Sequence, residues 1–351
     1  MSESQKSIPN QRWRLHGKDG VDALHLEQDS FVPKLGEHEV LLEIQAVSLN
    51  YRDIAMISGQ YPMASIDPLV PVSDAAGIVK AVGPKVTRFK PGDDALPIFT
   101  QSALFGDVQD KDRATGLGGL IDGVLQKVAV FDEQSLVHMP SNCDHQQGAT
   151  LPCAAVTAWN ALFGLEGKRL APAQWVLTQG TGGVSLFAVQ FAKAAGARVV
   201  ATTSSDEKAN LLKTLGADHV INYKKDESWG ETARMFTGGI GFHHVVDVGG
   251  NGTLGQAMKA VRRHGVVSVI GFLGNGQQPG PSVLDALMRG CIIRGIAVGS
   301  RDMLEAVVDL VEAQDIKPVI AETVFKFEEV KEAYKYMAKQ GHTGKVVIQV
   351  A

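Results

Sequence analysis

The chain has 351 residues, which at roughly 100–200 residues per domain is enough for about two domains with separate hydrophobic cores. Hydrophobic residues make up 44% and charged residues 21% of it, close to the globular average, which excludes disordered and fibrous classes. Its 34 basic and 38 acidic residues give a formal charge of −4 without a long block of either sign, so no nucleic-acid or membrane-surface footprint is visible.

The cysteines and the first residues bear on the cellular compartment. Cys143, Cys153 and Cys291 stand far apart with no C-x-x-C pair, which favours a reducing compartment and argues against a thiolate zinc site. The opening MSESQKSIPN lacks the apolar core of a signal peptide, and no 18-residue apolar run occurs. We therefore expect a cytoplasmic protein with neither a membrane nor a nucleic-acid partner.

The first part of the chain, from about Trp13 to His138, has the rhythm of a compact β domain. Short apolar or alternating segments are broken by Gly, Pro and Asp, as in the runs 39–49, 75–83 and 123–131.

From about Trp175 to Gly299, buried-type apolar runs alternate with amphipathic stretches. This alternation predicts right-handed crossovers and a doubly wound parallel sheet, an α/β fold. A further helix is predicted near 302–313, and the last run, 345–350, is expected to rejoin the sheet of the first domain, which would then be discontinuous. The predicted strands are 175–178, 197–203, 219–223, 243–248, 266–272 and 292–298, and the predicted helices are 184–195, 205–215, 229–237, 253–263 and 283–290.

A glycine-rich turn follows the first of these strands. Gly180, Thr181, Gly182, Gly183 and Val184 lead into a helix with apolar residues at i, i+3, i+4 spacing. Gly180 permits a tight turn, Gly182 lets the backbone approach a pyrophosphate, and the N–H groups of the helix start can face the anion. Such a turn alone is a weak pattern, but here strand, turn, helix and second strand are all in place, which favours dinucleotide binding.

The residues after the second strand bear on which dinucleotide binds. An NAD-type site places an acid about 20 residues beyond the first glycine, and none stands at 200–204. Ser204 and Lys208 instead offer a hydroxyl and an ammonium, which suit a phosphate ester and predict NADPH. Alternatively, Ser204 is a helix N-cap with Glu207 completing a capping box, and Lys208 is a solvated charge. Both interpretations can hold at once.

Several segments along the chain, from Trp13 to Val350, together resemble the medium-chain dehydrogenase/reductase superfamily, in its zinc-independent quinone oxidoreductase-like branch. They are SLNYRDIAMISGQYP (48–62), PLVPVSDAAGIVKAVG (68–83), RFKPGDDAL (88–96), ATLPCAAVTAWNAL (149–162), the glycine-turn run (179–208), GADHVINYKK (216–225) and HTGKVV (342–347). The resemblance implies a GroES-like β-rich catalytic domain at 1–154 and 303–351 and a Rossmann domain at 155–302. It also implies a cleft between them for a nicotinamide dinucleotide, and we expect a homodimer.

The metal ligands of that superfamily are replaced in this chain. Zinc-using members place a cysteine where this chain has Asn50, and a Gly-His-Glu element where it has Val72-Ser73-Asp74. Their lobe of four cysteines is also missing, because 97–119 contains none. Without thiolate or imidazole ligands a tetrahedral zinc site cannot be assembled, so we expect no metal cofactor.

A zinc-free site must support developing charge with hydrogen bonds, which favours an enone, enal or quinone, whose charge spreads into an enolate, over a simple alcohol. The resemblance points to Asn50, Tyr51 and Asp74 as the polar groups of the cleft. Asn50 would hold the carbonyl or the nicotinamide ribose, Tyr51 would donate a hydrogen bond or a proton, and Asp74 would orient neighbours. Structural roles remain open: a left-handed loop residue, a packing residue and a turn cap, respectively.

The resemblance also names cofactor contacts. Tyr223 would lie beside the adenosine phosphate, or simply end a parallel strand. The long polar stretch 99–123 is expected to wall the substrate pocket together with the turn 60–62. The other candidates are Thr157 near the nicotinamide, Gly249, Phe272 and Val298 as backbone walls, and Arg301 and Lys345 as phosphate contacts.

These expectations combine into an NADPH-dependent reductase of activated double bonds or quinones, acting on a small molecule. One alternative is an NAD(P)-dependent alcohol or carbonyl oxidoreductase. Another is a protein that binds NADPH as a sensor, or joins a partner, without turnover, because function lives in the site rather than in the scaffold.

Overall fold

The computed structural model describes residues 8–31, 34–271 and 280–351. It divides into two compact units: unit 1 is Met1–Val156 with Gly299–Ala351, and unit 2 is Thr157–Val298. The sequence-based domain boundaries were 154/155 and 302/303. No helix in the described ranges is long and apolar enough to cross a membrane.

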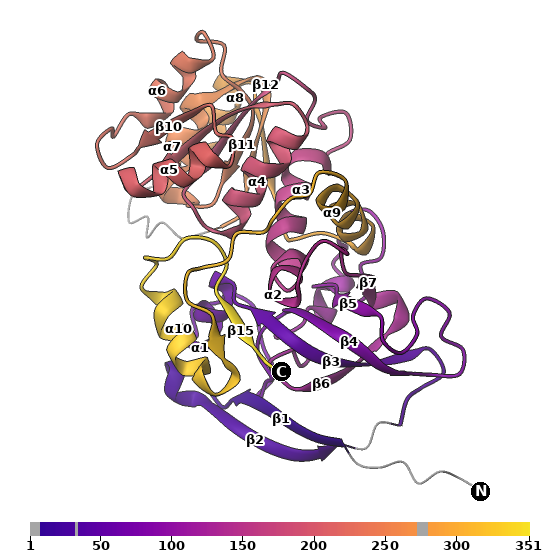
Figure 1. The fold of residues 1–351 in the computed structure, drawn as a ribbon. Coiled ribbons are helices and arrows are strands. Elements are labelled where there is room, and N and C mark those ends of the chain that lie inside the picture. The colour runs from indigo at the N-terminus through magenta and orange to yellow at the C-terminus, as the bar shows by residue number, and fades with distance from the viewer. Residues whose placement is uncertain (1–7, 32–33, 272–279) are drawn as a thin grey trace, which may run out of the picture. The chain divides into compact units, whose positions relative to one another are not determined.

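Unit 2 is built on a parallel sheet with helices on both faces (Figure 1). Its spatial strand order is β10-β9-β8-β11-β12-β13. From β8 the chain adds strands on one side, and from β11 it adds them on the other, so a topological switch point lies between β8 and β11. The carboxyl ends of the strands at such a switch point form a crevice that binds ligands. This sheet confirms the predicted α/β class. The strands are β8 (Trp175–Gln179), β9 (Arg198–Thr203), β10 (His219–Asn222), β11 (Phe242–Asp247), β12 (Val261–Val269) and β13 (Ile292–Gly295); the helices are α3 (Val156–Phe163, beginning at the end of unit 1), α4 (Gly183–Ala194), α5 (Asp206–Thr214), α6 (Trp229–Phe236), α7 (Asn251–Ala260) and α8 (Val283–Arg289).

Two element ends in unit 2 differ from the prediction. The helix predicted over 253–263 ends at Ala260, because Val261 already pairs with Phe242 of β11 and its valine side chain is buried. The helical period continues through Arg262 and Arg263 in the sequence, but the sheet pairing decides the conformation. The strand predicted over 292–298 ends at Gly295.

Unit 1 is a mostly antiparallel β structure. Its larger sheet runs β14-β15-β3-β4-β5-β7, with β6 also paired to β3, and the hairpin of β1 and β2 forms a second sheet. The strands are β1 (Ile8–Leu15), β2 (Leu24–Phe31), β3 (Glu39–Ser48), β4 (Asp74–Val82), β5 (Asp94–Pro97), β6 (Val128–Asp132), β7 (Leu136–His138), β14 (Phe325–Lys326) and β15 (Val347–Gln349); the helices are α1 (Tyr51–Ile57), α2 (His145–Gly148), α9 (Arg301–Ala313) and α10 (Val330–Ala338). Of the predicted run 123–131, only the part from Val128 onward is a strand.

The end of the chain returns to unit 1, as predicted. Strand β15 pairs antiparallel with β3, with Val347 opposite Ser48, and Leu49 N donates to the Val346 carbonyl at 2.9 Å. Lys345, just before β15, therefore lies next to Asn50, just after β3.

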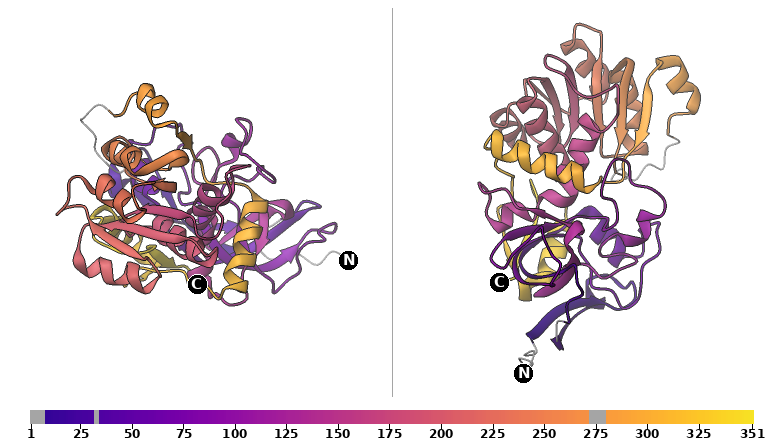
Figure 2. Two further views of the ribbon diagram at one scale, coloured as in Figure 1. Left: turned by 90° about the horizontal axis from the view of Figure 1, so that it is seen from above. Right: turned by 90° about the vertical axis from the view of Figure 1, so that its right-hand side faces the viewer.

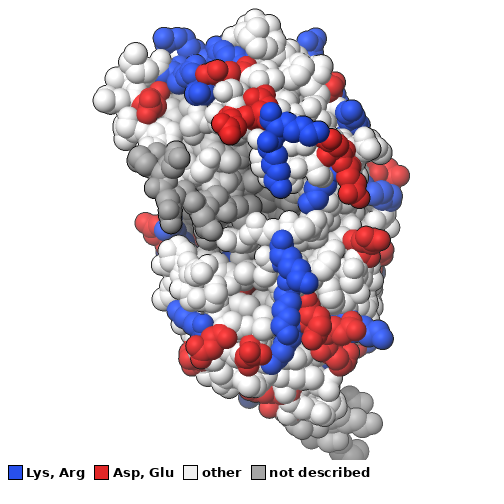
Figure 3. Space-filling view, turned by 90° about the vertical axis from the view of Figure 1, so that its left-hand side faces the viewer, with Lys and Arg blue, Asp and Glu red and all other residues white. Residues whose placement is uncertain are grey.

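Each unit has its own apolar core. Leu42, Ile44 and Val47 of β3 are fully buried in unit 1, and Leu177 and Val245 of the parallel strands are fully buried in unit 2. The face drawn in Figure 3 carries acidic and basic side chains close to one another.

Candidate active site

The glycine-rich turn of unit 2 is shaped for close approach of a ligand. Gly180 has φ +76°, and a Cβ added to Gly180 or Gly182 would meet no heavy atom within 4 Å, so this side of the turn is open. Helix α4 follows with 12 residues and has no side-chain hydrogen bond capping its start. Its first N–H groups can therefore bind an anion, and the turn fits the pyrophosphate of a dinucleotide.

A buried hydrogen-bond network, which sequence reasoning missed, ties β8 to β11 at the switch point. Asp247, at the end of β11, accepts from Gln179 Nε2 at 2.9 Å, from Thr253 Oγ1 at 2.8 Å and from Gly250 N at 2.8 Å. Burial raises the pKa of Asp247, against these hydrogen bonds. Thr253 also packs on Gly249, where an added Cβ would lie 2.4 Å from Thr253 Oγ1. The sequence clue was an acid directly after the apolar run of β11.

The ends of β9 and β10 bring the predicted phosphate-selecting residues to the same edge. Tyr223 N donates to the Thr203 carbonyl at 3.0 Å, and the Tyr223 side chain is exposed. Ser205, not Ser204, caps α5: its hydroxyl accepts from Lys208 N at 3.3 Å. The Ser204 hydroxyl is therefore not the one that caps α5.

The first acid after β9, Asp206, already has partners. Asp206 accepts from Asn222 Nδ2 at 3.0 Å and from Lys225 Nζ at 2.6 Å, and the bond from Lys225 is the main cause that lowers the pKa of Asp206. Both partners of this carboxylate thus come from the end of β10 and the residues that follow it.

Of the residues predicted beside the nicotinamide or as backbone walls, Thr157, Gly249 and Val298 lie in described parts of unit 2, and one does not. Thr157 is buried in α3. Val298 has φ +57°, a costly conformation for a β-branched residue, and its carbonyl accepts from Asn160 Nδ2 at 2.7 Å. Arg294 holds Asn160 in turn, through the Asn160 carbonyl at 2.9 Å and Oδ1 at 2.8 Å. Phe272 lies outside the described residues.

In unit 1, two of the three predicted catalytic residues, Asn50 and Asp74, lie around one ammonium group. Lys345 Nζ lies 2.8 Å from the Leu49 carbonyl, 2.5 Å from Asn50 Oδ1 and 3.4 Å from Asp74 Oδ2. Asp74 is fully buried, opens β4 opposite Ser48 and accepts from Ser73 Oγ at 2.7 Å, so it is not a turn cap. Asn50 has φ −120°, an extended rather than a left-handed conformation.

The two basic residues expected at phosphates have other partners. The ammonium of Lys345 binds Leu49, Asn50 and Asp74, as described above. Arg301, the first residue of α9, donates to the Gln134 side chain at 2.5 Å and to its carbonyl at 3.2 Å, and stacks 4.9 Å from the Phe105 ring centre. Both side chains are buried.

Two further titratable residues belong to this cluster. Asp53 of α1 is buried and accepts from Asn50 N at 2.7 Å; burial raises its pKa to about 6. Cys153 lies in a π-helical turn (Leu151–Ala155), a feature frequent at functional sites, and desolvation raises the pKa of its thiol to about 12. Asp53 was not among the predicted site residues.

The donor set here does not fit a zinc ion. Asn50 Oδ1 and Asp74 Oδ2 already bind an ammonium, whose positive charge stands where a cation would have to bind. Among the residues that the structure describes, no three His, Cys, Asp or Glu side chains come close enough to hold a metal.

Arg52 connects the segments that we expected to wall the substrate pocket. Its guanidinium donates to the carbonyls of Leu117 and Gly118 at 2.8 and 2.9 Å, and lies 4.8 Å from the Phe99 ring centre and 5.5 Å from that of Tyr61. The stretch 99–123 is therefore a folded segment anchored on α1 rather than a free loop.

The same segments expose apolar side chains. Met63, Ile66 and Leu120 are each about 40% exposed, and Ile66 N donates to the Gly119 carbonyl at 3.0 Å, which brings the two segments together. Tyr51 is half-buried against the core of unit 1.

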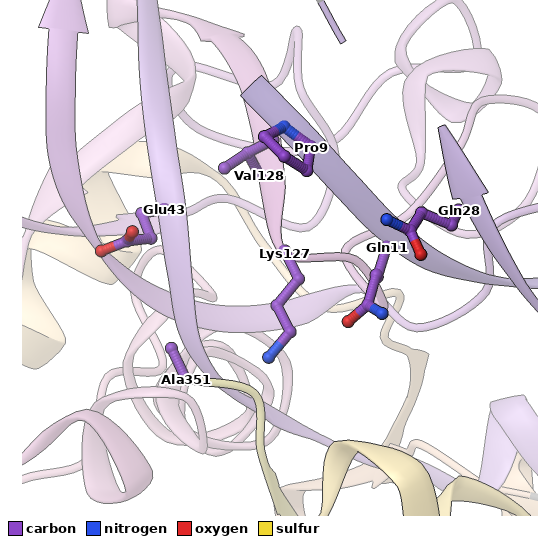
Figure 4. A pocket seen from close by; sticks show the side chains of 7 residues that line it. All are labelled: Pro9, Gln11, Gln28, Glu43, Lys127, Val128 and Ala351. Carbon is purple, nitrogen blue, oxygen red and sulfur yellow. The ribbon is translucent and has the colours of Figure 1, made fainter. Parts of the chain in front are cut away.

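A separate cavity of about 410 Å³ lies elsewhere in unit 1 (Figure 4). It contains none of the predicted site residues, so we do not assign it to the active site. Its lining is Pro9, Gln11, Gln28, Glu43, Lys127, Val128 and Ala351.

Comparisons with known proteins agree with this division into two parts. Residues 36–141 match the alcohol dehydrogenase GroES-like domain and residues 183–313 the zinc-binding dehydrogenase domain. A zinc-type alcohol dehydrogenase-like protein of Schizosaccharomyces pombe is 45% identical, covering 97% of this chain and 99% of the relative. The NADPH-dependent alkenal/one oxidoreductase of Arabidopsis thaliana is 30% identical, covering 97% and 80%. The crystal structure of an NAD-dependent alcohol dehydrogenase superposes with a TM-score of 0.86 at 29% identity, covering 97% and 100%.

Proposed function

The chain belongs to the medium-chain dehydrogenase/reductase superfamily and is a dehydrogenase/reductase that uses a nicotinamide cofactor, and on that premise we propose that it reduces activated double bonds or quinones with NADPH. The observation that carries the proposal is the ammonium of Lys345 on Asn50 and Asp74, where zinc-using relatives hold a metal. Hydrogen bonds, rather than a Lewis acid, must then support the charge that develops on the substrate.

The reaction balances as a conjugate reduction. When bound at the glycine-rich turn, NADPH would supply a hydride to the β-carbon of the enone and be oxidised to NADP⁺. The C=C electron pair moves to form an enolate, and one proton from a side chain or water completes the product at the α-carbon. For a quinone, the hydride and one proton give the hydroquinone.

The residues of unit 1 provide donors for such an enolate. The Asn50 amide nitrogen is buried and has no hydrogen-bond partner among the described residues, so it can donate to the substrate oxygen. The Tyr51 hydroxyl, on the next residue, is the proposed proton donor. If it is, Tyr51→Phe lowers kcat roughly ten- to a thousandfold, with the Kd of NADPH nearly unchanged.

The preference for NADPH is supported at the ends of β9 and β10. Ser204 and Lys208 follow β9, Tyr223 follows the neighbouring strand β10, and Asp206 is paired with Lys225. The carboxylate of Asp206 is thus paired, and a 2′-phosphate would have the donors of Ser204 and Lys208 beside it.

The exposed apolar side chains of Met63, Ile66 and Leu120 support a substrate with an apolar chain next to its carbonyl. The dispersed cysteines support a cytoplasmic location.

We also propose a homodimer formed through α8 and β13 of unit 2. Val283, Leu284, Leu287 and Met288 of α8 are between 67% and 88% exposed, and β13 is an edge strand with unpaired backbone groups. Both views of Figure 2 show α8 standing out at the margin of unit 2. A second copy could pair edge to edge and cover the same face on each subunit.

One assay separates the candidate functions. Purified protein is mixed with NADPH or NADH and a panel of enones, enals, quinones and saturated alcohols, with and without exhaustive chelation, while nicotinamide absorbance is followed. We expect NADPH-dependent reduction of at least one activated alkene or quinone, unchanged by chelation. Oxidation of alcohols alone, or loss of activity on chelation, would favour the alcohol dehydrogenase function named for two of the relatives. Tight NADPH binding without turnover would favour a sensor.

A further inference from the structure

Lys345 is held inside unit 1 with all its donors used. An ammonium carries three N–H bonds, and Lys345 has three acceptors: the Leu49 carbonyl, Asn50 Oδ1 and Asp74 Oδ2. Its side chain is 4% exposed. No donor is left over for a phosphate group of the cofactor, so its task lies inside this cluster.

The backbone fixes the lysine at this place. Lys345 N donates to the Val319 carbonyl at 3.0 Å, and its own carbonyl accepts from Ala321 N at 2.8 Å. Gly344 before it has φ +79°, and a Cβ there would lie 2.5 Å from the Val319 carbonyl oxygen. Only glycine fits, which locks the approach of the lysine to Asn50.

The contact with the lysine determines which way the Asn50 amide points. Only the amide oxygen can accept from an ammonium, so Oδ1 faces Lys345 and Nδ2 faces away. That nitrogen is buried without a partner among the described residues, which is unfavourable until an acceptor binds. The positive charge on the oxygen side also polarises the two N–H bonds on the other side.

We propose that Lys345 is a positioning residue which, through Asn50, replaces the positive charge that zinc-using relatives supply with a metal ion. The inference rests on the proposed function, because the acceptor it requires is the substrate oxygen on which negative charge develops. A lysine that served only the ion pair with Asp74 would need no contact with Asn50, and a buried ion pair alone adds little stability over apolar packing.

The test is a double-mutant cycle on kcat for an enone, with the KM of NADPH and the unfolding midpoint measured for each variant. Lys345→Met removes the charge at similar length, Asn50→Ala removes the amide, and the double variant closes the cycle. Lys127→Met is the control, because this lysine also donates to a backbone carbonyl, that of Val350, but lies outside the cluster.

We expect Lys345→Met to lower kcat roughly ten- to hundredfold while the KM of NADPH changes by less than about twofold. The double variant should be no slower than Asn50→Ala alone within about twofold, because the lysine acts through the amide. Added propylamine should restore part of the kcat of Lys345→Ala, and a neutral alcohol of the same size should not. Losses that multiply, or a rise in the KM of NADPH at constant kcat, would overturn the inference.

Two outcomes, a variant that does not fold and a wild type that reduces no enone, call for further variants or substrates. If Lys345→Met does not fold because Asp74 is left unpaired, Lys345→Met with Asp74→Asn removes both charges and takes its place in the cycle. If the wild type reduces no enone or quinone but oxidises alcohols, the proposed function fails, and the same cycle on alcohol oxidation still decides whether Lys345 and Asn50 act as one unit.

Discussion

Lys208, in the first turn of α5, carries the proposed discrimination between the two nicotinamide cofactors. Lys208→Ala removes one charge-assisted contact to the 2′-phosphate, so the Kd of NADPH should rise roughly ten- to hundredfold and that of NADH much less. Titration by nucleotide fluorescence measures both. Lys213→Ala, an exposed lysine in the last turn of the same helix, is the matched control and should change neither. Equal losses for both nucleotides in Lys208→Ala would make this lysine a bystander.

Asp53 gives the stability of the protein a distinctive pH dependence. Burial raises its pKa from 3.8 to about 6, so the folded state holds this proton more tightly than the unfolded state does. The contribution of Asp53 to stability is therefore full below about pH 4 and is lost as the pH rises through about 6, a change of roughly 3 kcal/mol.

Asp53→Asn keeps an oxygen that can accept from Asn50 N but cannot ionise. Between pH 4 and 7, the free energy of unfolding of this variant should therefore rise relative to the wild type, as urea titrations at each pH would show. A difference between the two proteins that does not depend on pH would show that Asp53 titrates normally.

For single residues, the sequence predicted which residues belong to the site better than it predicted their roles. Asn50, Asp74 and Lys345 were all candidates, but Lys345 was expected at a phosphate, because the predicted return of 345–350 to the first sheet does not tell which strand it pairs with. Asp53 escaped notice for the same reason: its burial and its neighbours come from segments distant in the chain. The Ser204 cap was off by one residue, since the choice between adjacent serines depends on where the strand ends.

Among the elements, the anchoring of 99–123 on α1 makes a testable link between one side chain and a wall of the proposed pocket. Arg52→Lys keeps the charge but loses the forked geometry that reaches both the Leu117 and Gly118 carbonyls. We expect faster hydrogen exchange in 99–123 and a several-fold higher KM for the enone, with the Kd of NADPH unchanged. Arg113→Lys, at an exposed ion pair with Asp110 in the same stretch, is the control. Unchanged hydrogen exchange of 99–123 in Arg52→Lys would mean that contacts within this segment, and not Arg52, stabilise its conformation.

The parallel strands were predictable because apolar runs alternating with amphipathic helices leave few topologies. The helix boundary at Ala260 and the short strand β6 were not predictable, because sheet pairing decides both. The hydrogen-bond cluster of Ser102, Asp112 and Thr115 inside 99–123 has no periodic sequence pattern that would predict it. Its hydroxyls and carboxylate bond one another, with Ser102 Oγ donating to Asp112 Oδ1 at 2.7 Å. Such polar turns are specified by single contacts that a pattern does not reveal.

For the whole molecule, the proposed dimer depends on the apolar face of α8. Leu287→Glu places a charge in that face, so light scattering should show the mass of one chain where the wild type shows two, with circular dichroism unchanged. Met235→Glu, on α6 and equally exposed, is the matched control and should leave the dimer intact. A monomeric wild type, or a variant that stays dimeric, would contradict the proposed interface.

In the reaction that we propose, the enzyme delivers hydride to a carbon–carbon double bond conjugated to a carbonyl, with hydrogen-bond donors in place of a metal. The most direct measurement uses NADPH carrying deuterium at both C4 positions and an enone that the wild type consumes, with the product analysed by NMR. We predict deuterium on the β-carbon of a saturated ketone whose carbonyl is intact. Deuterium on the carbinol carbon of an allylic alcohol would show that the hydride goes to the carbonyl carbon instead, and the proposed reaction would be wrong.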